Sequence, residues 1–465
     1  MQSNVNQNNQ ENDLNIKGHS TLSSLRALSP LLMFFSIFIG SGIYFTLIGK
    51  EFAFYQVSAS VAILPAIILA IFLAKAPLQK ALNVFLEGAR DNNIIIMCLI
   101  YLLAGAFATV LQNIGGVTST VNLALSFVPA KAALPALFII AGLVSTAMGT
   151  SMGTIAAVAP IGVGIANSIG IPLPLTMGAV VGGAMFGDNL SMISDTTIAA
   201  TQIHGCSNLA KFKQTLVIAL PALVVTLGIL TWYALTNEAE PTLVVGEYKV
   251  LSCLPYLVVL AMALWGVNVF VVLTTGIVAA GLIGIFSLPS YNLVSFSQNI
   301  FDGYKSMAEI LILSVLMGGL GELIKHQGGF SLLTRLLDRF LHKDKINTKA
   351  AEGAISTLVS FSDICTANNT TAIILSAEVT KEIAKKHKVS PARAATLVDL
   401  FACVFQGLLP YSAQILMAGS LAAISPLSII PEVHYCILLG ISGTIAIMFQ
   451  LPRLTIKREK IIEAN

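Results

Sequence analysis

Charged residues are scarce in this sequence and unevenly placed. They make up 11% of the 465 residues, whereas a soluble protein carries roughly 25%. Several stretches longer than about 18 residues, the length at which an apolar helix can cross a bilayer, contain no Lys, Arg, Asp or Glu. The scarcity of charge excludes a soluble enzyme, a nucleic-acid-binding protein and a disordered chain. It predicts an all-α polytopic membrane protein.

Metal-binding and disulfide patterns are absent as well. The six cysteines lie in or beside apolar segments, and none belongs to a CxxC pair or to a Cys/His pattern with the spacing of metal ligands. We interpret them as small apolar residues. No nucleophile–base pair is evident, so the sequence predicts neither an enzyme nor a cofactor. The net charge of +3 is too small to indicate nucleic acid as a partner.

Apolar stretches long enough to cross a membrane recur along the chain. The clear candidates are 27–48, 57–75, 94–113, 214–235, 250–266, 267–287, 307–325 and 432–451. Two further apolar regions, 133–203 and 350–425, have polar interruptions at GTSMGT (149–154), GDNLSMISDTT (187–197), DICTANNTT (363–371) and QGLLPYSAQ (406–414). Such interruptions are tolerated at membrane depth only where the backbone faces protein or a wet cavity. We therefore expect each region to form a re-entrant hairpin followed by a broken helix.

The basic residues predict an orientation. If the hairpins 133–170 and 350–387 return to their own sides, 22 of the 26 basic residues, Lys211 among them, fall on one face. The positive-inside rule makes that face cytoplasmic. Both termini are then cytoplasmic, with a disordered tail at 1–26 and a second tail at 452–465. The expected location is the cytoplasmic (inner) membrane, crossed many times.

The chain also repeats itself weakly, at a spacing of 219 residues. Pro172 and Phe186 recur as Pro391 and Phe405, and GTS (149–151) falls on NNT (368–370). The predicted orientation gives the halves 27–235 and 250–451 opposite topology. Inverted-topology repeats with re-entrant hairpins and broken helices are typical of secondary transporters, whose site lies between the repeats. Simple helices with Gly and Pro kinks are the alternative.

Acidic residues are the only charges that the sequence predicts deep in the membrane. Asp188, Asp195, Asp363 and Asp399 lie in or beside the interruptions, with no Lys or Arg expected at comparable depth. A carboxylate there costs about 2.5–3.5 kcal/mol on insertion scales unless it is protonated, hydrogen-bonded or bound to a cation. Competition between a proton and Na⁺ for one carboxylate would exchange the two ions. Asp188 and Asp195 are the leading candidates to hold Na⁺, and Asp399 is third.

Alternatives exist for each of these acids. Asp188 or Asp195 could cap a half-helix, and Asp363 could be an ordinary polar residue on the cytoplasmic arm. Oxygen ligands suited to a hard cation surround them. The candidates are Thr150, Ser151, Thr154, Asn189, Ser191, Ser194, Thr196 and Thr197, with Asn368, Asn369 and Thr370 in the second half. At a half-helix N-terminus, the last three would instead hold a carboxylate.

Two motifs resemble those of a known family. FGDNLSMISDTT (186–197) resembles the GD-x-x-S-x-x-SDTT signature of NhaC-type Na⁺/H⁺ antiporters, and GTSMGT (149–154) resembles their GTSWGT motif, with Met152 replacing Trp. The resemblance implies an inverted-repeat ion-transporter fold and cation-coupled transport. It implies functional roles for Thr150, Ser151 and Thr154 and for Asp188, Ser191 and Ser194 through Thr197. The second half departs from the pattern, since Asp399 precedes Leu-Phe-Ala instead of Ser-Gly-Thr.

The sequence therefore leaves two transport hypotheses. One is a secondary active transporter that exchanges Na⁺ for H⁺ by alternating access. The other is a Na⁺- or H⁺-coupled carrier of a small carboxylate or amino acid, since relatives of this family carry such solutes. The expected partners are the lipid bilayer, Na⁺ and H⁺, and the transported solute and a homodimer stay open.

Overall fold

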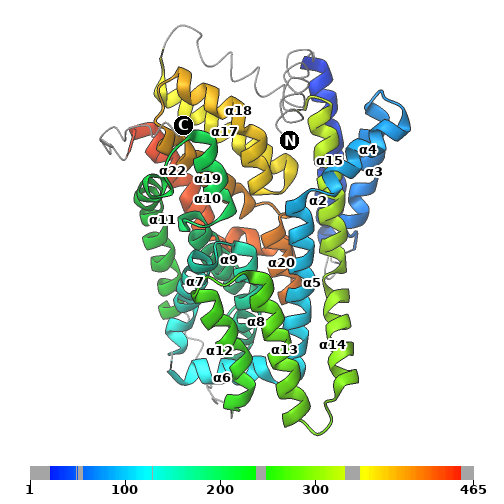
Figure 1. Cartoon of the computed structure of the whole chain (residues 1–465), viewed down its shortest axis with the longest axis vertical. Coiled ribbons are helices and arrows are strands. Elements are labelled where there is room, and N and C mark those ends of the chain that lie inside the picture. The colour runs from blue at the N-terminus through cyan, green and yellow to red at the C-terminus, as the bar shows by residue number, and fades with distance from the viewer. Residues whose placement is uncertain are drawn as a thin grey trace, which may run out of the picture.

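The chain folds into a bundle of helices of very different lengths (Figure 1). The structure, a computed structural model, describes residues 21–48, 50, 56–127, 129–236, 248–329 and 346–451, and those residues contain no strand. Six of the described helices are long and apolar enough to cross a membrane. They include α2 (Thr21–Leu47), α5 (Asn92–Asn113), α7 (Ala130–Met148), α8 (Ser151–Ile169), α11 (Asn208–Thr236) and α13 (Val269–Ser287).

Three more predicted spans are shorter apolar helices: α3 (Ala59–Leu73), α12 (Val250–Leu264) and α22 (His434–Phe449). The predicted span 307–325 falls on Ala308–His326, which is long and apolar enough together with Leu293–Ser306, from which it is bent by 43°. The chain is therefore an all-α polytopic membrane protein, as its composition predicts. Residues 1–20 of the expected N-terminal tail, and the tail 452–465, lie outside the described residues.

Two helical hairpins enter the bundle from opposite ends (Figure 1). One consists of α7 and α8, and the other of α17 (Thr348–Thr366) and α18 (Asn369–Lys386). A single left-handed residue joins the arms of each hairpin, Gly149 with φ 69° in the first and Ala367 with φ 52° in the second. Glycine adopts this conformation without strain, whereas alanine does so at a steric cost. The polar interruptions predicted as hairpin tips are therefore confirmed as sharp turns between helices.

A broken helix follows each hairpin. In the first half, α9 (Leu173–Leu190) and α10 (Asp195–His204) are separated by residues 191–194. In the second half, α19 (Pro391–Gln406) and α20 (Ala413–Ala422) are separated by residues 407–412, and α21 (Pro426–Ile429) follows. Each break coincides with a polar interruption of the sequence.

The two halves match in register at a spacing of 218 residues rather than the 219 read from the sequence. Helices α7 and α17 begin at Ala130 and Thr348, and α10 and α20 begin at Asp195 and Ala413. The difference arises at the prolines on which the sequence register rests. Pro172 is the N-cap of α9, whereas Pro391 is the first residue of α19. Proline is accepted at either position, so it marks a helix start only to within a residue.

Helices of the two halves pack closely against each other through glycines at two equivalent helix–helix crossings. The first is between α4 (Leu78–Ala89) and α15 (Ala308–His326), and the second is between α14 (Leu293–Ser306) and α5. A Cβ at Gly88 would clash with the carbonyl of Gly318, and one at Gly105 would clash with the carbonyl of Gly303. Small residues at such crossings allow close backbone approach inside a membrane. A short helix, α6 (Gly116–Phe127), precedes the first hairpin.

Candidate functional site

Both hairpin tips and the broken helix α9–α10 line one interior cavity of about 80 Å³. That is several times the space that a single water molecule needs. The sequence-predicted site residues that line it are Thr150, Ser151, Asp188, Ser194, Asp195, Thr196, Asn368, Asn369 and Thr370. The fold therefore brings together polar residues from both halves of the chain.

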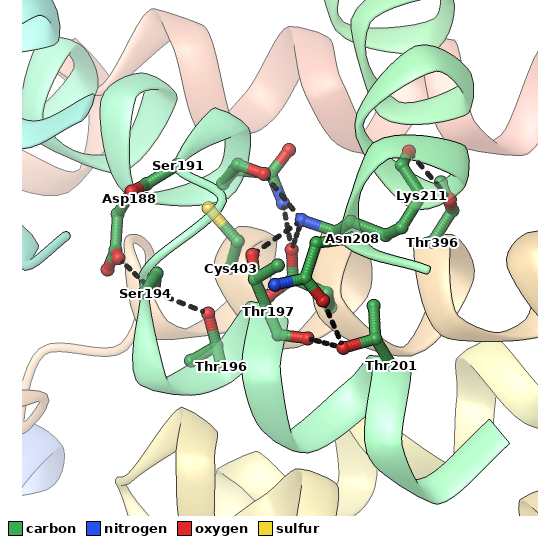
Figure 2. A network of polar contacts seen from close by, with 12 residues as sticks. Asp188, Ser191, Ser194, Thr196, Thr197, Thr201, Asn208, Lys211, Thr396 and Cys403 are labelled. Atoms are coloured by element: carbon green, nitrogen blue, oxygen red, sulfur yellow. Dashed lines mark hydrogen bonds and ion pairs between the residues drawn. The ribbon is translucent and has the colours of Figure 1, made fainter. Parts of the chain in front are cut away.

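Asp188 is buried in the last turn of α9, where two serine hydroxyls hold its carboxylate. Ser151 donates to Oδ2 at 2.8 Å from the first hairpin tip, and Ser194 donates to Oδ1 at 2.5 Å from the helix break. Ser194 Oγ also lies 3.0 Å from Thr196 Oγ1, and Figure 2 shows Ser194 between Asp188 and Thr196. Asp188 thus accepts hydrogen bonds on both oxygens, and it also interacts with the backbone N–H of Ser151 at the start of α8.

A chain of hydrogen bonds extends from Asp188 into the second half. Gln414 Nε2 donates to Ser151 Oγ at 3.1 Å, and Gln406 Nε2 donates to Gln414 Oε1 at 2.8 Å. Both glutamines line the cavity, as do Asn93 and Met97 of α5. The sequence offers Gln406 and Gln414 as oxygen donors of the last polar interruption, although they were not among the selected ligands, and it gives no indication of Asn93 or Met97. The only sequence signal for the glutamines is their place in the last polar interruption, and Asn93 lies at the start of an ordinary apolar span.

Four helix N-termini converge on the cavity, those of α8, α10, α18 and α20. The cavity lining includes their first or second residues, namely Ser151, Asp195, Asn369 and Gln414. Asp195 is exposed and is the first residue of α10, where a carboxylate interacts favourably with the helix dipole. No Lys or Arg is among the residues that line this cavity. The helix dipoles are therefore the positive partner of its two carboxylates.

The two hairpin tips share one capping arrangement. Thr150 Oγ1 accepts from the backbone N–H of Gly153 at 3.4 Å, and Asn368 Oδ1 accepts from that of Thr371 at 2.9 Å. The two caps are 218 residues apart and satisfy equivalent backbone groups. Thr150 and Asn368 therefore both build the tips and line the cavity.

The expectation that no basic residue lies at depth is wrong. Lys211, counted on the cytoplasmic face from the sequence, is 1% exposed, and its Nζ lies 2.5 Å from Oδ2 of the equally buried Asp399. Nζ also donates to Asn189 O at 2.6 Å and to Thr197 Oγ1 at 2.9 Å, and Figure 2 shows Lys211 reaching into this network. The error arose because Lys211 lies in the first turn of α11, where a lysine normally points toward water.

The remaining predicted residues support the breaks without lining the cavity. Thr154 Oγ1 donates to Thr150 O at 2.9 Å, and Ser191 Oγ donates to Thr146 O at 2.9 Å. Asn189 Nδ2 donates to Asp399 Oδ2 at 2.9 Å, so Asn189 and Asp399 belong to the Lys211 network together with Thr197. Asp399, the third predicted ion ligand, is therefore occupied by an internal cation, the lysine.

Asp363 is not an ordinary polar residue on an exposed arm, which was the alternative considered from the sequence. Its side chain is fully buried in α17. Neither carboxyl oxygen has a hydrogen-bond partner in the part of the chain that the structure describes.

Comparisons with known proteins identify a family and several relatives. The model of the Na⁺/H⁺ antiporter family matches residues 2–237. The Na⁺/H⁺ antiporter NhaC of Bacillus subtilis (strain 168) is 29% identical over 223 residues, which are 45% of this chain and 48% of that protein. The malate-2H⁺/Na⁺-lactate antiporter of the same organism is 39% identical over 113 residues, 24% of each chain.

A longer alignment covers both halves. An uncharacterized Na⁺/H⁺ antiporter of Haemophilus influenzae is 26% identical over 341 residues, which are 65% of this chain and 71% of that protein. The similarity to the two Bacillus proteins covers half of their length or less.

Proposed function

Because the chain belongs to the Na⁺/H⁺ antiporter family, we propose that it exchanges Na⁺ for protons across the cytoplasmic membrane. The family consists of transporters, and its model covers the half of the chain that holds Asp188. The environment of Asp188 carries the proposal. A buried carboxylate with two hydroxyl donors lines the cavity, and it has no basic partner among the described residues.

The hydroxyls around Asp188 suit both ions. A serine hydroxyl has one donor and two acceptor lone pairs and rotates to match its partner. Ser151 and Ser194 donate to the Asp188 carboxylate. When Na⁺ binds, the hydroxyls turn their lone pairs toward it, as a hard cation requires. When a proton binds, the carboxyl O–H donates to a hydroxyl oxygen, and Na⁺ is excluded. One site therefore holds either ion but not both.

Alternating access follows from the two matching halves. We propose that 27–235 and 250–451 are inverted repeats, and that one hairpin with its broken helix moves against the rest. A second cavity of about 160 Å³ shares Asn93 and Asn368 with the first and is also lined by Glu87 and Glu322. Helices α4 and α15, which carry these two glutamates, reach the end of the molecule at which α17 and α18 lie (Figure 1).

That end is the cytoplasmic one under our proposal, with both termini on it. Basic residues at the ends of its helices support the orientation: Lys75, Lys80, Arg90, Lys325, Lys385 and Lys386. The described conformation then opens its ion cavity toward the cytoplasm.

One observation favours a second candidate function, the cation-coupled carriage of a small carboxylate. The N-terminus of α18, with Asn369 and Thr370, faces the cavity, and helix N-termini bind anions. The similar Bacillus malate-2H⁺/Na⁺-lactate antiporter is named for such solutes. Antiport of Na⁺ and H⁺ remains our first proposal because Asp188 and Asp195 already provide the negative charge that these dipoles stabilise.

Reconstituted proteoliposomes with an internal pH-sensitive dye test the proposal. Addition of Na⁺ should move protons in the wild type, and Asp188→Asn should abolish this movement because an amide cannot exchange a proton for Na⁺. Asp302→Asn is the matched control, since Asp302 is 57% exposed in a surface ion pair with Lys305. Full exchange by Asp188→Asn would contradict the assigned site. Labelled malate uptake without any Na⁺-driven proton movement would establish the second function instead.

A further inference from the structure

The side chain of Asp363 forms a buried carboxyl group that ion exchange at Asp188 does not use. It lies in the last turn of α17, close to the second hairpin tip, with 0% exposure. Neither oxygen has a hydrogen-bond partner among the described residues, and Asp363 is not among the residues that line the Asp188 cavity.

The charged groups on the helices packed against α17 do not neutralise Asp363. On α19, α15 and α17 itself, Arg393, Glu352, Asp399, Lys325 and Glu322 are in ion pairs with one another or with Lys211. Lys349, Glu309 and His326 are exposed near helix ends. On α18, four charged residues are exposed in the last two turns, away from the tip: Lys381, Glu382, Lys385 and Lys386. On α22, His434 lies 3.7 Å from Glu432.

The nearer titratable groups are uncharged thiols and phenols. Tyr411 donates its Oη to Ile364 O at 2.7 Å, and Cys365 is a free, buried thiol next to Asp363 in the chain. The titratable thiols and phenol of α19 and α22, which are Cys403, Tyr435 and Cys436, are buried as well. None supplies a positive charge. An ionised carboxylate without a donor or a cation is strongly disfavoured in such surroundings, so Asp363 is neutral and carries a proton in this conformation.

The register between the halves relates Asp363 to a hydrogen-bond donor of the first half. At the 218-residue spacing, Asp363 corresponds to Ser145, whose hydroxyl donates to Ala184 O at 2.6 Å and so ties α7 to α9. A protonated carboxyl has an O–H donor at the equivalent place, whereas a carboxylate has none.

The same spacing relates Asp188 to Gln406. Gln406 Nε2 donates to Ala367 O at 3.1 Å, and its Oε1 has no partner in the described chain. Each half therefore has, among the described residues, a buried carboxyl group without a basic partner where a hairpin arm meets a broken helix. In the first half this group is Asp188, on the broken helix. In the second half it is Asp363, on the hairpin arm.

We propose that Asp363 is a second proton-binding site, contributed by the second half, which carries one proton per transport cycle. The proposal rests on the antiport function proposed above. When movement of α17–α18 admits water, the carboxyl O–H bond breaks and the proton passes to a water molecule on that side. Water on the opposite side reprotonates the carboxylate in the other conformation. Each cycle then exchanges one proton more than Asp188 alone would.

The coupling ratio of purified protein in proteoliposomes tests this site. Protons exchanged per Na⁺ are obtained from the membrane potential at which Na⁺-driven proton flux reverses. We expect one proton fewer per Na⁺ in Asp363→Asn and in Asp363→Ser. The second variant introduces serine, the residue found at the equivalent position of the first half, Ser145. Ser145→Ala is the matched control and should keep the wild-type ratio. An unchanged ratio in an active Asp363 variant would overturn the proposal.

Infrared spectroscopy of the folded protein provides a second readout that needs no transport. The wild type at neutral pH should show the C=O stretch of a protonated carboxyl group, and Asp363→Asn should lose it while eluting as a monodisperse protein. If the two spectra are the same in this region, Asp363 is not protonated and the proposal fails. If the wild type moves no protons with Na⁺ but the band is present, the antiport function fails while the protonated state of Asp363 stands.

Discussion

The buried Lys211–Asp399 pair offers a strong test of how this protein tolerates charge in its interior. Both side chains are 1% exposed, and Lys211 also donates to Asn189 O and Thr197 Oγ1. The pair thus joins α11 and α19 to both parts of the broken helix, next to Asp188. Removal of one partner leaves the other charge buried without compensation.

The expected energies follow from this geometry. Lys211→Met and Asp399→Asn should each lower the free energy of unfolding by about 3–5 kcal/mol, the usual cost of an uncompensated buried charge. The double variant has no buried charge and should lose only about 1–3 kcal/mol, for the remaining unpaired polar groups. The interaction energy of the double-mutant cycle should therefore reach about 3 kcal/mol or more.

Equilibrium unfolding in a denaturing detergent, followed by circular dichroism, measures these differences. Lys305→Met is the control, because the Lys305–Asp302 pair is exposed and should contribute less than about 1 kcal/mol. The reasoning is refuted if Lys211→Met is no more destabilising than Lys305→Met. It is also refuted if the losses of the single variants simply add in the double variant.

Two further predictions concern the ion site and the repeat contacts. Ser194→Ala removes one hydrogen bond to the Asp188 carboxylate, worth about 1.5–3 kcal/mol, and should raise the KM for Na⁺ roughly tenfold or more in the flux assay. Ser168→Ala, which removes an exposed hydroxyl bonded only to its own helix, should leave KM unchanged, and equal values for the two variants would argue against the site. Gly88→Ala should lower the yield of monodisperse protein, because its Cβ would meet the backbone of Gly318 and overpacking costs about 1–3 kcal/mol. Gly40→Ala has open space around it and should behave as wild type; a normal yield for Gly88→Ala would show that this crossing is not tight.

Local features of the sequence account for most of the fold. Long uncharged stretches can only be satisfied as membrane helices, and polar interruptions within them mark the hairpin tips and helix breaks. Gly149 has the left-handed conformation expected of a hairpin turn. Ala367 occupies the equivalent turn without being glycine, so the second tip could be placed only from its polar neighbours. The register differed by one residue because proline starts a helix from more than one position.

The site was partly predictable because some of its residues lie in short local motifs. Asp188 and Ser194 lie close together in the chain, and a short motif is enough to identify them. Ser151 belongs to a second motif, at the first hairpin tip. The glutamines that extend this network, Gln406 and Gln414, carry no motif that predicts a role.

The sequence by itself determined that this protein lies in a membrane, where its helices break and which carboxylates gather at the breaks. Those properties depend on hydropathy and on residues close together in the chain. Only the tertiary structure decided that Lys211 neutralises Asp399, that Gln414 reaches Ser151, and that Asp363 has no partner. Whether a buried charge is compensated depends on which helix faces meet, and residues far apart in the chain meet only after the helices pack.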